Sequence, residues 1–194
     1  MISDQISGIM KFFLILFLAG LCSVTTVVAQ DTSFHSGDKV LNLGIGIGTS
    51  IYAGDYYTTS VPPVSASFEV GVKDGVIDKG SIGAGGYLAY SAHKWESAGW
   101  GWKYSSVFIA ARGIFHYPLV GKMDTYTGIA LGLNISNSTE YGNPIPGDEH
   151  NATSGGVLYA WYLGGRYYFN KNFSAMAELG VGIVYLNLGA AFKF

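Results

Sequence analysis

Residues 173–194 read FSAMAELGVGIVYLNLGAAFKF, and this stretch decides the fold. From Tyr185 onward the residues alternate as in a β-strand, where successive side chains point to opposite faces. One face carries Leu186, Leu188, Ala190, Phe192 and Phe194, and the other carries Tyr185, Asn187, Gly189, Ala191 and Lys193. The first set is apolar and the second is small or polar. A strand of a soluble sandwich can show the same alternation, so the rest of the chain has to decide between the two environments.

The start of the chain has the pattern of a secretory signal peptide. Lys11 precedes the apolar run 12–18, and residues 27–29 (Val-Val-Ala) form a cleavage site before Gln30. The run is shorter than the roughly 20 residues that a transmembrane helix needs. We expect a cleaved signal peptide at 1–29, starting at Met1 or Met10, and one exported domain at 30–194. Cys22 lies within that peptide, so no disulfide is expected in the mature chain.

The composition favours β-strands with one face in lipid. The 194 residues include 28 glycines, 14 tyrosines and 11 phenylalanines, and only 12% are charged, against about 25% in an average protein. The mean hydropathy is +0.28, although the predicted mature chain has no second long apolar run. The net charge of −2 provides no basic surface for nucleic acid.

Period-two alternation recurs along the chain and predicts about eight strands. The predicted strands lie near 41–51, 64–73, 81–93, 103–117, 124–135, 157–169, 173–179 and 185–194. The connections 52–63, 93–102 and 136–154 are long, and those at 74–80, 118–122 and 170–172 are short. Aromatic residues, including Trp102 and Tyr167, gather towards predicted strand ends, where interface girdles are expected. This arrangement is typical of an eight-stranded, antiparallel, up-and-down transmembrane β-barrel. The short connection 180–182 breaks the alternation of loop lengths.

Charges in the predicted strands all fall on the inner face. They are Glu69, Lys73, Arg112, Asp124, Arg166, Glu178 and Lys193. A charge that faces lipid at mid-depth costs roughly 2–4 kcal/mol, so this segregation favours a hydrocarbon environment outside. We expect Glu69, Arg112, Arg166 and Glu178 to form one interior cluster. The cluster would fill a narrow lumen with salt bridges, or else line a pore.

No motif in the chain indicates catalysis, a cofactor or a metal. The G-x-G-x-G at 44–48 is not followed by a helix, which a dinucleotide site requires. The four histidines, His35, His93, His116 and His150, have no ligand partner at metal-binding spacing. The sequence therefore predicts a protein that is not an enzyme, with no catalytic, cofactor or metal site.

The chain resembles the small outer-membrane β-barrel proteins, which include opacity-like and OmpX/OmpA-type barrels. The resemblance is clearest in Gly-Gly-Arg-Tyr-Tyr-Phe at 164–169, Ala-Glu-Leu-Gly at 177–180 and the terminal Phe194, which look like the Bacteroidetes branch. It implies a location in the outer membrane of a Gram-negative bacterium and insertion by the barrel-assembly machinery. It implies no particular activity.

We therefore expect a monomeric barrel in outer-membrane lipid, with a structural or adhesion-like role carried by the loops 52–63, 93–102 and 136–154, which could meet an extracellular partner. The alternative is a narrow, porin-like pore or a carrier of small molecules that uses the lumen. An exported soluble barrel is disfavoured by the interior charges. An outer-membrane hydrolase is disfavoured because His116 points inward at the end with the short turns.

Overall fold

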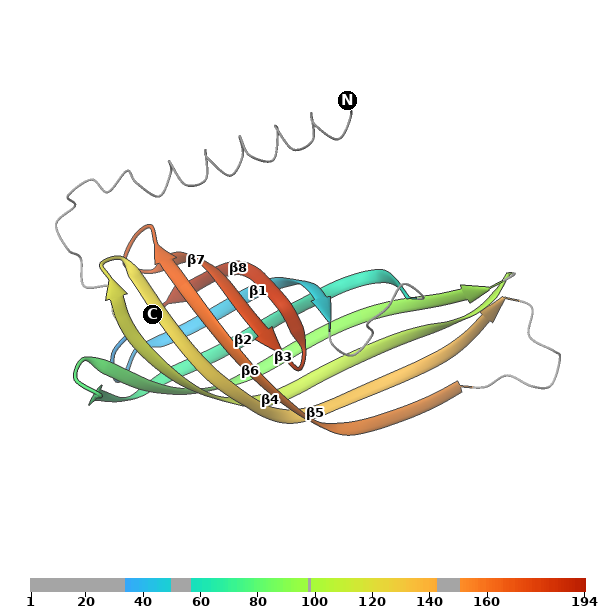
Figure 1. Cartoon of the computed structure of the whole chain (residues 1–194), viewed down its shortest axis with the longest axis horizontal. Coiled ribbons are helices and arrows are strands. Elements are labelled where there is room, and N and C mark those ends of the chain that lie inside the picture. Colours follow the sequence, from blue (N-terminus) through green and yellow to red (C-terminus); the bar gives the residue numbers. More distant parts are fainter. Residues whose placement is uncertain (1–33, 50–56, 98, 143–150) are drawn as a thin grey trace, which may run out of the picture.

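The computed structural model describes residues 34–49, 57–97, 99–142 and 151–194. Eight antiparallel strands follow one another in chain order around a closed barrel (Figure 1). They are β1 (Lys39–Thr49), β2 (Thr58–Val76), β3 (Gly80–Ser97), β4 (Trp100–Val120), β5 (Met123–Gly142), β6 (Asn151–Tyr168), β7 (Phe173–Val181) and β8 (Val184–Lys193). The predicted eight-stranded up-and-down barrel is confirmed. The predicted signal peptide lies outside the described residues, among which no helix has the length and apolarity needed to cross a membrane.

The barrel closes through the pairing of β8 with β1. Leu188 lies opposite Ile45 and Phe192 lies opposite Leu41, so the apolar faces of both strands point outward together. On the other face, Asn42 and Ala191 are paired and buried in the interior. From Leu186 onward, the side chains of β8 therefore point inward and outward as predicted.

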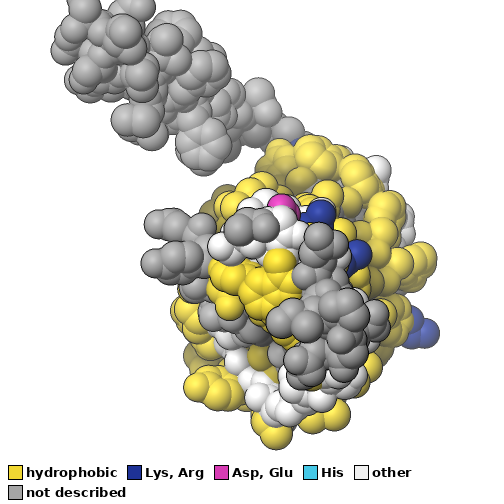
Figure 2. All heavy atoms as spheres, turned by 90° about the vertical axis from the view of Figure 1, so that its right-hand side faces the viewer, with side chains coloured by type: hydrophobic (Ala, Val, Ile, Leu, Met, Phe, Trp, Pro, Cys, Tyr) yellow, Lys and Arg dark blue, Asp and Glu magenta, His cyan; other side chains and the backbone are white. Residues whose placement is uncertain are grey.

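An apolar band surrounds the barrel. Seen from one end, hydrophobic side chains cover most of the circumference (Figure 2). On β5 the outward residues run from Met123 to Ile135, and Ile129, midway between them, is 66% exposed. A row of aromatic side chains, Tyr167, Phe169, Phe173 and Phe192, lies at one edge of the band, with ring centroids 5.3–5.7 Å apart. This row matches the predicted girdle at that end.

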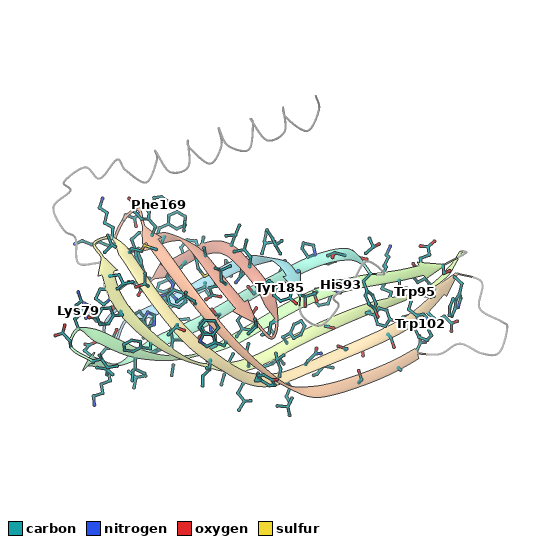
Figure 3. All side chains as sticks on the ribbon, in the orientation of Figure 1. Lys79, His93, Trp95, Trp102, Phe169 and Tyr185 are labelled. Atoms are coloured by element: carbon teal, nitrogen blue, oxygen red, sulfur yellow. The ribbon has the colours of Figure 1, made fainter. Side chains whose placement is uncertain are left out.

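The short turns and the start of β1 share one end of the barrel, which we call the turn end. Here β2 passes to β3 through Ile77 and Asp78, both with positive φ, and β4 passes to β5 through Lys122 at φ 66°. The end of β8 lies there too, because the Phe194 amide donates to the Lys39 carbonyl at 2.9 Å. Lys79 and Phe169 mark this end in Figure 3.

At the opposite end the wall has unequal height. Strands β2 to β6 continue well past the β7–β8 turn, as Figure 1 shows. We call the extended part the protruding sheet; it consists of residues 58–63, 91–97, 100–106, 136–142 and 151–156.

The prediction of three long loops is therefore largely wrong. Most of the described residues in 52–63, 93–102 and 136–154 belong to strands. Their backbones continue the antiparallel pairing of the barrel strands beyond the apolar band. Residues 50–56 and 143–150 lie outside the described part.

Three predicted side-chain positions are also wrong. Tyr185 on β8 is 46% exposed and does not point inward as predicted. The alternation shifts beside it at Gly48 of β1, which has a φ of 71°. Val184, the residue before Tyr185, points inward instead and packs against a buried cluster. Lys73 is exposed near the turn end, where a register irregularity follows Gly71. Trp102 is not in a girdle at the edge of the band; it pairs with Trp95 on the protruding sheet (Figure 3).

Candidate functional site: a charged interior cluster

The four charges predicted to meet all point into the barrel. Glu69 on β2, Arg112 on β4, Arg166 on β6 and Glu178 on β7 are each at most 7% exposed. They form two groups, and each group has one arginine. Asp124 and His116, which the sequence placed on the inner face but not in the cluster, complete the set. These six residues are called the interior cluster below.

Arg166 is at the centre of the first group. Its guanidinium lies 2.5 Å from a Glu69 oxygen and 2.8 Å from an Asp124 oxygen. Its Nε donates to the Asn42 side-chain oxygen at 3.0 Å. On the far side of Asp124, the His116 Nδ1 lies 3.0 Å from that carboxylate. Because buried charges cost free energy unless they are paired, these contacts are what allow Arg166 to be completely buried.

Arg112 and Glu178 form the second group. The guanidinium donates to the Glu178 Oε1 at 2.7 Å and to the Ser67 hydroxyl at 3.0 Å. It also lies over the ring of Tyr162, 3.8 Å from the centroid, in a cation–π contact. The Tyr126 hydroxyl donates to the same Glu178 oxygen at 2.9 Å.

Neutral side chains join the two groups into one network. Asn42 accepts from Arg166 and donates to Ser67, which also accepts from Arg112. Tyr126 connects them a second time, because its ring lies 4.4 Å from the Arg166 guanidinium carbon while its hydroxyl bonds Glu178. The network thus cross-links strands that are far apart around the barrel.

Inner-face glycines make room for the tyrosine rings in this network. A Cβ added to Gly164 would lie 2.6 Å from the Tyr126 ring, and one added to Gly128 would lie 2.3 Å from the Tyr162 hydroxyl. Both glycines are needed because of close approach, as expected inside a narrow barrel. Part of the glycine content is thereby explained by aromatic rings packed across the lumen.

The segment before β1 closes the turn end over the cluster. Phe34 is 3% exposed, and its ring stacks on His116 with centroids 3.9 Å apart. Its carbonyl accepts from the Ser81 hydroxyl at 2.6 Å. Phe34 therefore separates His116 from the outside at this end.

Apolar residues fill lumen space around and beside the cluster. One packed group contains Ala110, Ile114, Ala130 and Tyr162 together with Tyr126 of the network, and a second contains Ala89, Phe108, Leu158 and Ile183. A cavity beside Arg112 and Glu178 has a volume of about 40 Å³, which is space for only a few water molecules.

The sequence contained a signal for the two residues that the predicted cluster lacked. A tight turn at Gly121–Lys122 fixes the register of β4 and β5, and it places Asp124 on the same inner face as His116. The pairing of β5 with β6 brings Asp124 directly opposite Arg166. Among the described residues, no group of three or more His, Cys, Asp or Glu side chains is arranged to hold a metal ion.

Comparison with known proteins places the fold among small outer-membrane barrels. Two crystal structures of Ail, the attachment invasion locus protein of Yersinia pestis, superpose with TM-scores of 0.52 and 0.50, at 12% and 14% identity. Each match covers 82% of this chain and 99% of Ail. The outer-membrane protein OprG of Pseudomonas aeruginosa gives a TM-score of 0.46 at 12% identity, over 85% of this chain and 99% of OprG.

At these identities the likeness concerns the fold alone. No family model matches the chain, and no curated protein matches it by sequence. The resemblance to the Bacteroidetes branch therefore stays a prediction.

The pairing of Arg112 with Glu178 can be tested by comparing the single variant Arg112→Met with the variant that lacks both charges. Arg112→Met leaves Glu178 as a buried carboxylate without its guanidinium, so we expect a loss of about 3–5 kcal/mol in the free energy of unfolding. The double variant Arg112→Met/Glu178→Met removes both charges and should be more stable than Arg112→Met alone. Urea unfolding of the refolded protein in lipid vesicles measures both. A double variant less stable than the single one would show that the two charges are not coupled in this way.

Proposed function

We propose that the chain is an integral outer-membrane protein with a surface-interaction role carried by the protruding sheet. The observation that carries this proposal is the segregation of charge. Outward residues of β5 from Ile129 to Ile135 are apolar, whereas Arg166 and Glu69 are buried inside. A soluble barrel would have the opposite arrangement, with an apolar interior and a polar exterior. The proposal includes export by means of the predicted signal peptide and insertion by the barrel-assembly machinery.

The chemistry of the outer face changes where the protruding sheet begins. Above Ile135 the outward residues of β5 are Asn137, Thr139 and Tyr141. Charged residues such as Lys94 are exposed only on this part of β3. This polarity suits an aqueous environment, and it leaves the apolar band below as the part within lipid.

The concave face of the protruding sheet carries an aromatic group near its tip. Trp95, Trp100 and Trp102 make edge-to-face pairs with centroids 5.5 and 6.3 Å apart, and the Trp100 Nε1 donates to Glu140. On the outer face of the same sheet, the Tyr141 hydroxyl donates to Glu96 at 3.0 Å, and partial desolvation together with this carboxylate raises the pKa of Tyr141. These cross-strand contacts stiffen the sheet outside the membrane, so that it presents one defined surface to a partner.

The interior gives less support to a pore or a carrier. The charged network, the tyrosine rings and Phe34 occupy the lumen across its width at the turn end. We propose that the lumen is sealed and that the chain acts as a monomer without catalytic activity. The role would then depend on the protruding sheet.

A charge placed in the apolar band tests the membrane assignment. Ile129→Arg puts a guanidinium near the middle of the band and should lower the free energy of unfolding in lipid vesicles by about 2–4 kcal/mol. The matched control is Thr139→Arg, on the same face of the same strand but on the protruding sheet, where the change should be about 0.5 kcal/mol or less. Equal effects at the two positions would argue against a lipid environment around Ile129.

Surface labelling tests the orientation. Ser97→Cys at the tip of β3 and Lys171→Cys at the turn end introduce single thiols, each in a Cys22→Ser background. A membrane-impermeant maleimide applied to intact cells should label Cys at 97 and not at 171, and both should react after the cells are lysed. Labelling at position 171 alone, or recovery of the protein in the soluble periplasmic fraction, would overturn the proposal.

A further inference from the structure

Two lysines lie directly opposite each other on the outer face of the protruding sheet. Lys94 of β3 pairs with Lys103 of β4 in the antiparallel register, and both side chains are exposed. Lys94 shares the outward face of β3 with Tyr90, which belongs to the apolar band. Like charges that are directly opposed on one face of a sheet destabilise it. The pair therefore lowers stability unless an anion lies between the two ammonium groups.

The part of the chain that the structure describes does not supply this anion. Its ion pairs include neither Lys94 nor Lys103. Glu96, two residues further along β3, accepts instead from the Tyr141 hydroxyl. Lysines can also protect the edge of a sheet, but β3 and β4 both have neighbouring strands on each side (Figure 1). The pair therefore suits an anion from outside the chain.

Hydroxyl groups flank the two lysines in the same row. Thr58 of β2 lies opposite Lys94, and Thr139 of β5 lies opposite Lys103. Both threonines are exposed. Ammonium and hydroxyl groups donate to phosphate oxygens, and two ammonium groups match the charge of about −1.5 to −2 on a phosphate monoester at neutral pH. These four residues, called the lysine row below, have the donors and the charge for one such group.

A groove in the apolar band lies below the lysine row on β2, β3 and β4. It has a volume of about 380 Å³, and its outward side chains are Val64, Ala66, Leu88, Tyr90 and Val107. Ala66 has the smallest of these side chains and lies opposite Leu88, so the wall is thinnest there. Apolar walls within the lipid layer suit a hydrocarbon chain.

The height of the lysine row matches that of lipid headgroups. From Tyr90 to Lys94 the strand rises by about 13 Å, which is about 10 Å of height at the usual strand tilt of barrels. The headgroup layer is about 5–7 Å deep on each side of the hydrocarbon. Lysine stems are long and flexible, so the ammonium groups can bend back into this layer while the groove stays below it.

We infer that the lysine row and the groove together bind one membrane lipid that carries a phosphate monoester in its headgroup. The inference rests on the proposed function, because it requires the protruding sheet to lie outside the membrane and the apolar band within it. The phosphate lies between Lys94 and Lys103 and accepts from the flanking hydroxyls. One acyl chain of the same lipid lies in the groove beside Ala66.

Other anions match only half of this arrangement. Free phosphate would occupy the lysine row and leave the groove without an occupant. An acidic peptide would have to place a segment within the hydrocarbon, where its backbone groups would lack hydrogen-bond partners. A lipid has its charge and its chain at the separation that the two parts of the site require.

The first test compares lipids with equal chains and different headgroups. Dipalmitoyl phosphatidic acid ends in a phosphate monoester, whereas in dipalmitoyl phosphatidylcholine the phosphate is esterified and offset by choline. Native mass spectrometry of the full protein in detergent micelles counts the lipid molecules that bind as each lipid is added. We expect one phosphatidic acid molecule to bind at least about tenfold more tightly than phosphatidylcholine. Equal affinities for the two lipids would overturn the inference.

The lysines are tested with a pair of double variants. Lys94→Gln/Lys103→Gln removes both charges of the lysine row and should weaken phosphatidic acid binding by at least about tenfold. The matched control, Lys73→Gln/Lys171→Gln, removes the same charge from two exposed positions at the turn end. Because salt screens charges at that distance, the control should change the affinity less than about twofold. Undiminished binding to Lys94→Gln/Lys103→Gln would overturn the inference.

The groove is tested by filling it. Ala66→Phe puts a ring into the groove and should weaken phosphatidic acid binding by about fivefold or more. Ala177→Phe makes the same change on the outward face of β7, away from the groove, and should change binding less than about twofold. Inorganic phosphate at the concentration of the lipid should not displace it. Full affinity in Ala66→Phe, or displacement by inorganic phosphate, would overturn the lipid as the occupant.

The comparison of the two lipids needs no substitution, so it stays decisive if a variant does not fold. Surface labelling at position 97 together with equal affinities for the two lipids would overturn only the lipid site. The proposed function would then stand.

Discussion

Closure of the sheet is the constraint on which the rest of the structure depends. Within an apolar layer there is no water to bond backbone amides and carbonyls, so each strand needs a partner on both sides. The pairing of β1 with β8 meets this requirement, and it sets the outward direction of Leu41 and Phe192. Beyond the band the requirement is relaxed, because water can bond an open edge. Strands β7 and β8 are the shortest of the eight, and β2 to β6 continue past the β7–β8 turn into the protruding sheet (Figure 1).

The narrow lumen imposes a second requirement. Eight strands leave an interior that side chains just fill, so every inward charge has to find its partner inside the wall. Arg112 and Arg166 do so in two groups that share Ser67, Asn42 and Tyr126. The same contacts fix the relative positions of strands that do not touch, and we regard the interior cluster as the structural centre of the barrel.

The sequence predicted most of the barrel because alternation is local. The phase of β8 from Leu186, the inward direction of Arg166 and Glu178, and the number of strands all follow from a period of two. The protruding sheet was missed because its outward face is polar, and segments between strands without an apolar face resemble loops. Tyr185 was misplaced because a single glycine with positive φ shifts the alternation. The pairing of Asp124 with Arg166 depends on inter-strand register, which no local pattern contains.

The central claim is a barrel that spans a membrane and is sealed by its own side chains. Single-channel recording of residues 30–194 refolded into a planar bilayer tests it most directly. Stable insertion without stepwise conductance is predicted, because the interior cluster, the tyrosine rings and Phe34 fill the lumen. Steady, reproducible openings would contradict the sealed barrel and would make Glu69, Arg112, Arg166 and Glu178 pore-lining residues.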